Sequence, residues 1–354
     1  MHKLDNPQLY TDLDKQNMLG HIRHIPDMCR QAWQTASAFA LPKDYSRINR
    51  VVVLGMGGSA IGGDLVAGLI EGDADIPIFV NRGYNLPAVV DDNTLVIAAS
   101  YSGMTEETLS ALGQAINSGA KKLIITTGGR LKDIAQQHGI PVFAFDYRSQ
   151  PRAAFPFIFL PILSFIQQLG KINDMSADID EMVGVLDRLN NEINETVPLD
   201  NNRAKQLAQQ LQGRLAVFYG GGITSAVARR WKTQLNENSK AWAFYDVFPE
   251  LNHNTVVGYC FPQELTSKTA VVMLRSECLP EPILRRYQAT SGILKKAGIS
   301  HLTIDGLGKS KLAQMMSLVL FGDYTSYYLA LLNGVDPTPI EAIDCLKGEL
   351  GKDK

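Results

Sequence analysis

The chain has 354 residues, of which 45% are hydrophobic and 20% are charged, and its net charge is −2 at pH 7. This length allows two domains with cores of ordinary size, and the near-neutral charge argues against nucleic acid or an acidic membrane surface as the main partner. The four cysteines are scattered without a CxxC pair, which excludes a zinc knuckle and a disulfide scaffold.

Two further features concern location. The amino-terminal residues lack the apolar core of a signal peptide. The most apolar stretch, residues 153–165, contains two prolines and is shorter than the roughly 20 residues that a membrane helix needs. We therefore expect a cytoplasmic protein that has no membrane contact, with this stretch buried as a helix or strand.

Residues 1–45 are predicted to form a helical arm, and residues 46–165 a first subdomain. Short apolar runs rich in β-branched residues alternate there with helical patterns, which predicts a mainly parallel, doubly wound sheet flanked by helices. The expected strands lie at residues 51–54, 76–81, 94–99, 122–127 and 141–145, and the expected helices at 65–70 and 105–118.

A glycine-rich turn follows the first strand and opens a helix. Its backbone N–H groups and the helix dipole make it a candidate anion site. The spacing of Gly55, Gly57 and Ala60 also fits a dinucleotide-binding turn. That reading requires an acidic residue after the second strand, but this strand ends at Asn81 and Arg82, which argues against it.

A serine-rich turn follows the strand at 94–99. Ser100, Ser102 and Thr105 surround Gly103 and precede a helix. Hydroxyl donors at a helix N-terminus suit a phosphate group. The alternative is that these residues only cap the helix, which is the usual role of a single Ser or Thr.

The second half repeats the first. After a helical connector at residues 166–200, the segment 201–354 again shows a strand (215–219), a glycine turn (220–222) and later strands at 269–274 and 301–306. This self-similarity predicts two tandem α/β subdomains, the second of which carries a catalytic insertion near residues 232–265 and a C-terminal helix. The sequence LRSECLPE replaces the serine-rich turn, so we expect one phosphate site, in the first half.

Proton-transfer chemistry on a small substrate needs a carboxylate or another side chain that can act as a base, often together with a second acid or base. Glu237, Glu250 and His253 are candidates within the expected insertion. Arg152, before the most apolar run, is a candidate for stabilising an enediolate oxygen, with an ordinary ion pair as the alternative. Lys347 on the C-terminal helix could equally be a solvated surface lysine.

The motif GMGGSAIGGD, followed about 40 residues later by SYSGMTEET, resembles the sugar isomerase (SIS) domain, whose members are α/β units that bind phosphosugars. By this resemblance, Gly58, Ser59, Ser100, Ser102 and Thr105 hold the substrate phosphate. SIS domains also occur in non-catalytic sensors and in amidotransferases. The chain lacks both the DNA-binding helix-turn-helix of the sensors and the N-terminal cysteine of the amidotransferases.

Further motifs resemble the bifunctional phosphoglucose/phosphomannose isomerase family from about residue 15 to the C-terminus: PRAAF, QLNENSK, FPELNHN and DPTPIEAIDCLK. The resemblance implies that Glu237 is the proton-shuttling base and that Arg152 stabilises the enediolate. It assigns ring opening to His253 and Lys347. It also points to Thr338 as the residue that accommodates both C2 epimers.

The same resemblance implies a homodimer in which His253 reaches the site from the neighbouring subunit. The expected activity interconverts glucose 6-phosphate and mannose 6-phosphate with fructose 6-phosphate through a cis-enediol, without a metal or redox cofactor. The alternative function is a phosphosugar-binding sensor without turnover. A sensor would not need Glu237 together with His253.

Overall fold

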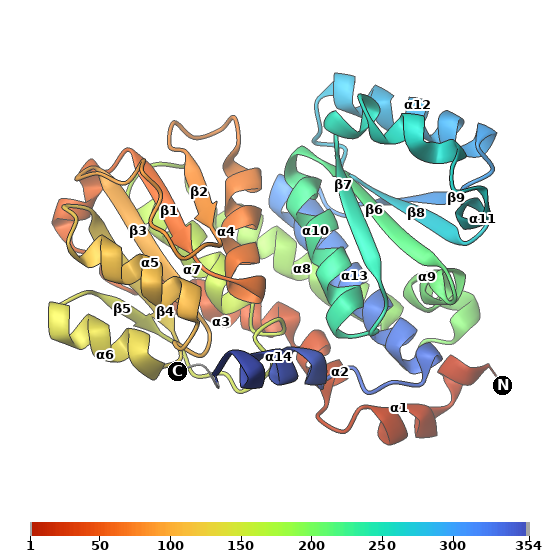
Figure 1. Cartoon of the computed structure of the whole chain (residues 1–354), viewed down its shortest axis with the longest axis horizontal. Coiled ribbons are helices and arrows are strands. Elements are labelled where there is room, and N and C mark those ends of the chain that lie inside the picture. The colour runs from red at the N-terminus through yellow and green to blue at the C-terminus, as the bar shows by residue number, and fades with distance from the viewer. Residues whose placement is uncertain (1, 352–354) are drawn as a thin grey trace.

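The computed structural model describes residues 2–351 and shows two parallel sheets side by side, each flanked by helices (Figure 1). The first sheet has the order β2-β1-β3-β4-β5, and every neighbouring pair is parallel. Its central strands are buried on both faces because helices cover both sides. Its strands are β1 (Arg50–Leu54), β2 (Ile78–Asn81), β3 (Thr94–Ser100), β4 (Lys121–Thr126) and β5 (Val142–Ala144).

The second sheet repeats the first with one strand fewer. Its order, β7-β6-β8-β9, matches β2-β1-β3-β4 strand for strand, and all its pairs are parallel. The predicted fold class, two tandem SIS-type α/β subdomains with mainly parallel sheets, is therefore confirmed. The strands are β6 (Leu215–Gly221), β7 (Ala243–Phe248), β8 (Thr269–Arg275) and β9 (Ser300–Asp305).

Helices from both halves fill the space between the sheets. Helix α4 contacts α10 of the other half, α7 packs on α3 and α4, and α13 packs on α8, α9 and α10. The helices are α1 (Pro7–Leu13), α2 (Met18–Arg23), α3 (Ile25–Ser37), α4 (Gly57–Ile70), α5 (Glu106–Ile116), α6 (Gly129–His138), α7 (Pro156–Gln168), α8 (Ser176–Ile193), α9 (Arg203–Leu211), α10 (Ser225–Glu237), α11 (Gln263–Thr266), α12 (Glu281–Lys296), α13 (Lys311–Asn333) and α14 (Glu341–Gly351).

Two helices explain the apolar stretches of the sequence. Helix α7 contains the proline-interrupted run and is buried from Pro156 to Ile166. Helix α13 is buried from Leu312 to Leu332 because other helices surround it. A helix that is apolar on all sides belongs in a core. One hydrophobic cluster accordingly runs through both halves. Within residues 2–351, no helix is long and apolar enough to cross a membrane.

The segment expected to be an insertion, residues 232–265, contains several elements. Its first part is the end of α10 and all of β7, which have counterparts in α4 and β2. The extra length lies after β7, where residues 249–268 replace the shorter link 82–93 of the first half. This longer link contains the short 3-10 helices at Glu250–Asn252 and Thr255–Cys260, and helix α11.

Candidate active site

The glycine turn after β1 lies directly against the segment that carries Arg152. Gly57 begins α4 with a φ of +47°, a left-handed conformation that glycine adopts without strain. A Cβ atom on Gly58 would lie 3.0 Å from the Pro151 carbonyl oxygen and 3.1 Å from the Arg152 Cα. A side chain at position 58 would have to push the 151–152 backbone away, so glycine permits this close contact between the turn and Arg152.

The serine-rich turn after β3 is ordered by its own hydroxyl groups. The Ser100 Oγ lies 2.8 Å from the Thr105 Oγ1 and accepts the Gly103 N–H at 3.1 Å. The Ser102 Oγ accepts the Met104 N–H at 3.2 Å. Thr105 occupies the N-cap position of α5 but makes no side-chain cap bond. Its hydroxyl is therefore not a helix cap, which removes the alternative reading for this residue.

Ser59 joins the two turns. Its Oγ accepts the Tyr101 N–H at 3.3 Å, and Ser59 itself is buried in the first turn of α4. The five residues proposed for the phosphate thus meet at the carboxyl ends of β1 and β3, where the helices α4 and α5 begin. Both helix N-termini point their free N–H groups toward this edge.

Arg152 is buried and donates four hydrogen bonds to two segments, residues 237–238 and 337–338. Its Nε donates to the Asn238 Oδ1 at 2.7 Å. Its Nη2 donates to the carbonyl oxygens of Pro337 at 2.8 Å and of Thr338 at 2.9 Å. Its Nη1 contacts the Glu237 carboxylate at 3.4 Å, which is long for a charged hydrogen bond. Three of these bonds fix the guanidinium, while the Nη1 group keeps capacity for another partner.

Glu237 and Arg152 form a partly open ion pair. The Arg152 side chain is 2% exposed, whereas that of Glu237 is 25% exposed. Burial lowers the pKa of Arg152, and the nearby Glu237 carboxylate opposes that shift. A carboxylate that reaches solvent beside an immobile guanidinium can take up a proton while the guanidinium stabilises negative charge on oxygen.

A buried polar seam between α10 and α13 supports this pair. The Asp323 carboxylate accepts hydrogen bonds from the Arg230 Nη2 at 2.6 Å and from the Gln234 Nε2 at 2.9 Å. Burial raises the pKa of Asp323, and Arg230 opposes that shift. A buried ion pair costs desolvation, and additional hydrogen bonds are needed to offset it. Gln234 supplies one of them.

Two sets of hydrogen bonds connect this polar seam to Arg152. The Arg230 Nη2 donates to the Arg152 carbonyl oxygen at 3.1 Å, and its guanidinium lies 3.9 Å from the ring centre of Phe155. Asn238, which accepts from Arg152, donates through Nδ2 to the Ser326 Oγ at 2.9 Å. The main chain and the side chain of Arg152 are therefore both anchored to α10 and α13.

A groove of about 780 Å³ opens beside Glu237. It is lined by residues of the 236–242 segment and of the 335–343 segment, including Lys240 and Trp242. This volume is in the range of small-molecule sites. Thr338 lies next to the groove and is 3% exposed, and its Oγ1 has no hydrogen-bond partner. A buried hydroxyl without a protein partner is uncommon.

His253 does not lie with these residues. Helix α10 returns from the carboxyl end of β6, so Glu237 lies near the start of β7, whereas His253 follows the end of β7. His253 is exposed. The neighbouring asparagines do not hold its ring: Asn252 donates to the Thr290 Oγ1 at 2.8 Å, and Asn254 donates to the Glu250 carboxylate at 2.9 Å.

Lys347 also stays apart from the pair. It is exposed on α14, below the two sheets in Figure 1. Ile343, one helical turn earlier, lines the groove. Positions four apart share a helix face, so Lys347 lies on the side of α14 that faces the groove. It is one helical turn beyond Ile343, the last residue that lines the groove.

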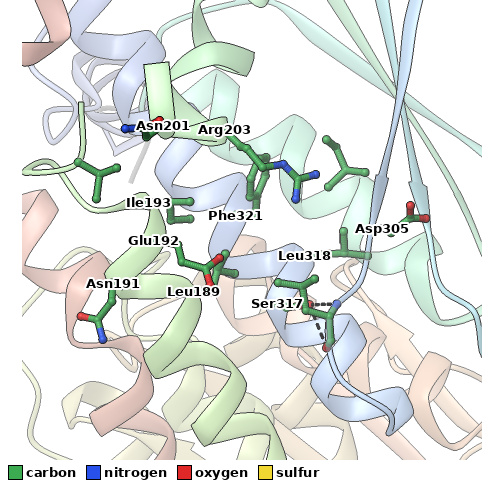
Figure 2. A pocket seen from close by; sticks show the side chains of 13 residues that line it. Leu189, Asn191, Glu192, Ile193, Asn201, Arg203, Asp305, Ser317, Leu318 and Phe321 are labelled. Carbon is green, nitrogen blue, oxygen red and sulfur yellow. Dashed lines mark hydrogen bonds between the residues drawn. The ribbon is translucent and has the colours of Figure 1, made fainter. Parts of the chain in front are cut away.

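Another cavity, of about 390 Å³, lies between α8, α9, β9 and α13. Figure 2 shows its apolar floor, which includes Leu189, Ile193 and Phe321, and its charged rim with Arg203 and Asp305. The Arg203 guanidinium lies 5.8 Å from the ring centre of Phe321. None of the candidate phosphate or catalytic residues lines this cavity, so it is separate from the site above.

The structure also bears on a dinucleotide or metal site. At the end of β2, Arg82 pairs with Asp64, and the Asn81 side chain donates to the carbonyl oxygens of Gly83 and Asn85. No carboxylate follows this strand to bind a ribose, which agrees with the sequence argument. Among residues 2–351, no group of three or more His, Cys, Asp or Glu side chains is placed to hold a metal ion.

Sequence reasoning missed the residues that hold Arg152 and Glu237 in place. Asn238 and Lys240 stand within the QLNENSK motif, but only Glu237 was selected there. Asp323 gave a clearer signal. An acidic residue inside the long apolar pattern of α13 must be paired when buried, and its partner could have been sought among the arginines of the second half.

Comparisons with known proteins place the chain in a family. Residues 200–350 match the family described as "Bacterial phospho-glucose isomerase C-terminal SIS domain". A bifunctional phosphoglucose/phosphomannose isomerase from Caldicellulosiruptor bescii is 40% identical over 338 residues, which cover 95% of this chain and 100% of the relative. A protein of the same name from Aquifex aeolicus is 34% identical and covers 88% of this chain and 93% of its own length.

Among solved structures, a hypothetical protein from Thermus thermophilus is similar with a TM-score of 0.76. It is 17% identical, and the alignment covers 98% of this chain and 92% of that one, which supports the fold alone. The identity to the curated relatives over nearly the whole chain decides the family. The chain belongs to the bifunctional phosphoglucose/phosphomannose isomerases and is a sugar phosphate isomerase.

Proposed function

We propose that this enzyme interconverts glucose 6-phosphate and mannose 6-phosphate with fructose 6-phosphate, with Glu237 as the base. The observation that carries the proposal is the Glu237 carboxylate beside the buried Arg152 guanidinium, at a groove of substrate size. The two aldoses differ only in configuration at C2, so both give the same cis-enediol. One carboxylate can therefore serve both substrates.

The proton transfer needs no external reactant. The Glu237 carboxylate removes the proton from C2 of the open-chain aldose, and the electrons of that bond form the C1–C2 double bond as the carbonyl oxygen gains negative charge. The Arg152 Nη1 group, whose contact with Glu237 is 3.4 Å, supplies a donor for that oxygen. A proton passes from the C2 hydroxyl to the C1 oxygen, and Glu237 returns its own proton to C1. The C2 oxygen becomes the ketose carbonyl, and the carboxylate is restored.

We propose that Gly58, Ser59, Ser100, Ser102 and Thr105 hold the 6-phosphate. Hydroxyl donors and free N–H groups at the starts of α4 and α5 suit a dianion, and helix dipoles add to the attraction. The contact of Gly58 with Arg152 supports a substrate that runs from these turns to the base. The fixed phosphate then sets which carbon reaches Glu237.

Thr338 is proposed to contact the sugar near C2 and C3. Its buried, unpartnered Oγ1 lies on the segment whose carbonyl oxygens hold Arg152. A small hydroxyl there leaves room for rotation about the C2–C3 bond of the enediol, which dual specificity requires. A sugar hydroxyl would supply the missing partner of the Thr338 side chain.

We further propose a homodimer in which His253 acts on the neighbouring subunit, with Lys347 as the second ring-opening residue. Strand β7 has 6 residues, which corresponds to about 20 Å at roughly 3.3 Å per residue. This length separates Glu237 from His253 within one chain. Large apolar side chains are exposed in both places, as an interface would require. Trp242, in the groove beside Glu237, is 76% exposed, and Val257 and Phe261, in the link that carries His253, are 78% and 82% exposed.

The four cysteines are unpaired, with Cys29 buried and the other three at least partly exposed. Free thiols support a reducing environment. We therefore propose that the enzyme works in the cytoplasm on hexose 6-phosphates of central carbohydrate metabolism.

Proton NMR in D2O with fructose 6-phosphate tests the reaction. We expect both glucose and mannose 6-phosphates with deuterium at C2, because the carboxylic acid exchanges its proton with solvent. Glucose 6-phosphate alone would restrict the proposal to one epimer, and no turnover would refute it. Glu237→Gln should lower kcat by about 1,000-fold or more, since the amide is not a base. The matched variant Glu281→Gln should stay within about threefold of the wild type, because that carboxylate lies on α12 in an exposed ion pair with Arg285.

A further inference from the structure

Lys240 has an unusual backbone conformation next to the proposed base. It follows the end of α10 and has a φ of +53°, in the left-handed region that residues other than glycine rarely adopt. Glycine would take this conformation without strain. The lysine side chain therefore has to make interactions that offset the strain.

The Lys240 ammonium contacts three main-chain carbonyl oxygens. Its Nζ lies 2.8 Å from the Glu237 oxygen, 3.4 Å from the Asn238 oxygen and 3.1 Å from the Pro337 oxygen. An ammonium has three donors, which matches these three acceptors. Two of the carbonyls belong to the C-terminal end of α10, where a positive charge is favoured by the helix dipole.

The third carbonyl connects two cations. The Pro337 oxygen also accepts the Arg152 Nη2 at 2.8 Å. Lys240 therefore joins the residue that bears the carboxylate to the same carbonyl that fixes the guanidinium. Removing the lysine leaves Glu237 attached to the 335–338 segment through the long 3.4 Å contact with Arg152 and through Asn238.

We propose that Lys240 is a positioning residue that ties the end of α10 to the 335–338 segment and so sets the Glu237 carboxylate against Arg152. The inference rests on the proposed role of Glu237. Lys240 acts through the main chain and does not have to touch the sugar, although it lines the same groove. A displacement of about 1 Å in such a pair is enough to cost about 100-fold in rate.

Charges on every neighbouring segment act on this ammonium. Burial and the Arg152 guanidinium lower the pKa of Lys240 to about 8, while Asp336, Glu237 and Glu341 oppose the shift. Above that pH the neutral amine has two N–H groups for three carbonyls and no longer complements the helix dipole. The kcat of the wild type should therefore fall as the pH rises through about 8.

The test compares wild type, Lys240→Met and Lys240→Arg with fructose 6-phosphate between pH 6.5 and pH 10. At pH 7, Lys240→Met should lower kcat by about 10- to 100-fold, with KM within about threefold, because phosphate binding is untouched. The alkaline fall of kcat should disappear in this variant. Lys240→Arg should recover part of kcat and move the fall to higher pH, because a guanidinium stays protonated there.

Lys232→Met, on the same helix and outside the groove lining, is the charge-matched control and should behave as the wild type. A fully active Lys240→Met alongside an inactive Glu237→Gln would overturn the role of Lys240 alone. A wild type without turnover would overturn the proposed function and this inference together. If Lys240→Met does not fold, the Lys240→Arg variant decides. A fall of kcat at the same alkaline pH as in the wild type would refute the inference.

Discussion

The two glycine turns, one in each half, have the same backbone shape but different surroundings. Gly57 after β1 and Gly222 after β6 have φ values of +47° and +50°. A Cβ on Gly57 would meet nothing within 4 Å, whereas on Gly222 it would lie 2.9 Å from the Leu279 side chain. A side chain at Gly57 would therefore meet open space, whereas at Gly222 it would meet Leu279, which lines a cavity of about 750 Å³ next to this turn.

The hydroxyl groups differ in the same way. In the second half, the Thr224 Oγ1 accepts the Gly221 N–H at 2.9 Å and donates to the Leu274 oxygen at 2.8 Å. The Ser276 Oγ, after β8, donates to the Gln314 Oε1 at 2.6 Å and is buried. In the first half, Ser102 is exposed. The Thr224 and Ser276 hydroxyl groups are thus used in hydrogen bonds within the protein, whereas the Ser102 side chain is exposed.

This comparison indicates a division of labour. On the proposed assignments, the first half would supply the phosphate turns, and the second half would supply the base from the C-terminal end of α10. Substitutions in the first half should then change KM, and those around Glu237 should change kcat. Arg152 lies at the junction, since its main chain contacts Gly58 and its side chain contacts α10.

Among the variants that test this division between the halves, the largest effect is expected for Arg152→Lys. Lysine keeps the charge but lacks the planar donor fork that reaches Asn238, Pro337 and Glu237 together. We expect kcat to fall by about 100- to 1,000-fold, the usual cost of losing a donor to a developing oxyanion. Steady-state kinetics with fructose 6-phosphate measures this.

The matched control is Arg229→Lys. Arg229 is partly exposed and contacts Asp64 at 3.5 Å, away from the groove. Its variant should keep kcat within about twofold, as expected for a surface ion pair. A wild-type kcat with a raised KM in Arg152→Lys would instead place the arginine with the phosphate turns and break the division between the halves.

Much of the fold could be predicted because its signals are local. Alternating apolar runs and helical patterns give the parallel sheets, and the repeated glycine turn gives the tandem arrangement. Glu237 and Arg152 could be selected from motifs. The contact between them could not, because it depends on how the start of α7 meets the end of α10, 85 residues away.

The missed residues act through packing of the same kind. Arg230 and Gln234 both donate to Asp323 on α13, about 90 residues further along the chain. A short-range sequence pattern therefore cannot predict this contact. Residues that are close in the sequence can also lie far apart in the structure. His253 is 16 residues from Glu237 in sequence, yet β7 lies between them, so the two residues are at opposite ends of this strand. Proximity in the sequence therefore does not bring the two residues together within one chain, and the expectation that His253 serves the neighbouring subunit stays a prediction.

A smaller effect is expected for Ser102→Ala in the first-half turn. If the Ser102 hydroxyl donates to the phosphate, its loss removes one hydrogen bond to a charged group, worth about 1.5–3 kcal/mol. We expect KM for fructose 6-phosphate to rise by about 10- to 100-fold with little change in kcat. Inorganic phosphate should lose inhibitory strength in parallel.

Ser110→Ala, further along α5, serves as the control for Ser102→Ala and should leave both constants near those of the wild type. An unchanged KM for Ser102→Ala would remove this hydroxyl from the phosphate site. A fall in kcat at constant KM would contradict the assignment of binding to the first half.

The smallest effect on activity is expected for Thr224→Val, the counterpart test in the second-half turn. Valine keeps the shape of threonine but leaves the buried Gly221 N–H without its acceptor. We expect the free energy of unfolding to drop by about 1–3 kcal/mol, the cost of a buried unsatisfied group. Denaturant titration measures this drop, and kinetics on the folded protein should show kcat and KM within about twofold of the wild type.

The reverse pattern would be informative. A KM raised tenfold in Thr224→Val at unchanged stability would mean that the second turn also binds the anion, although Leu279 lies beside it. Loss of stability with intact kinetics would instead show that the repeated turn is retained for packing. The φ of +50° at Gly222 would then be a requirement of the strand-to-helix connection itself, independent of ligand.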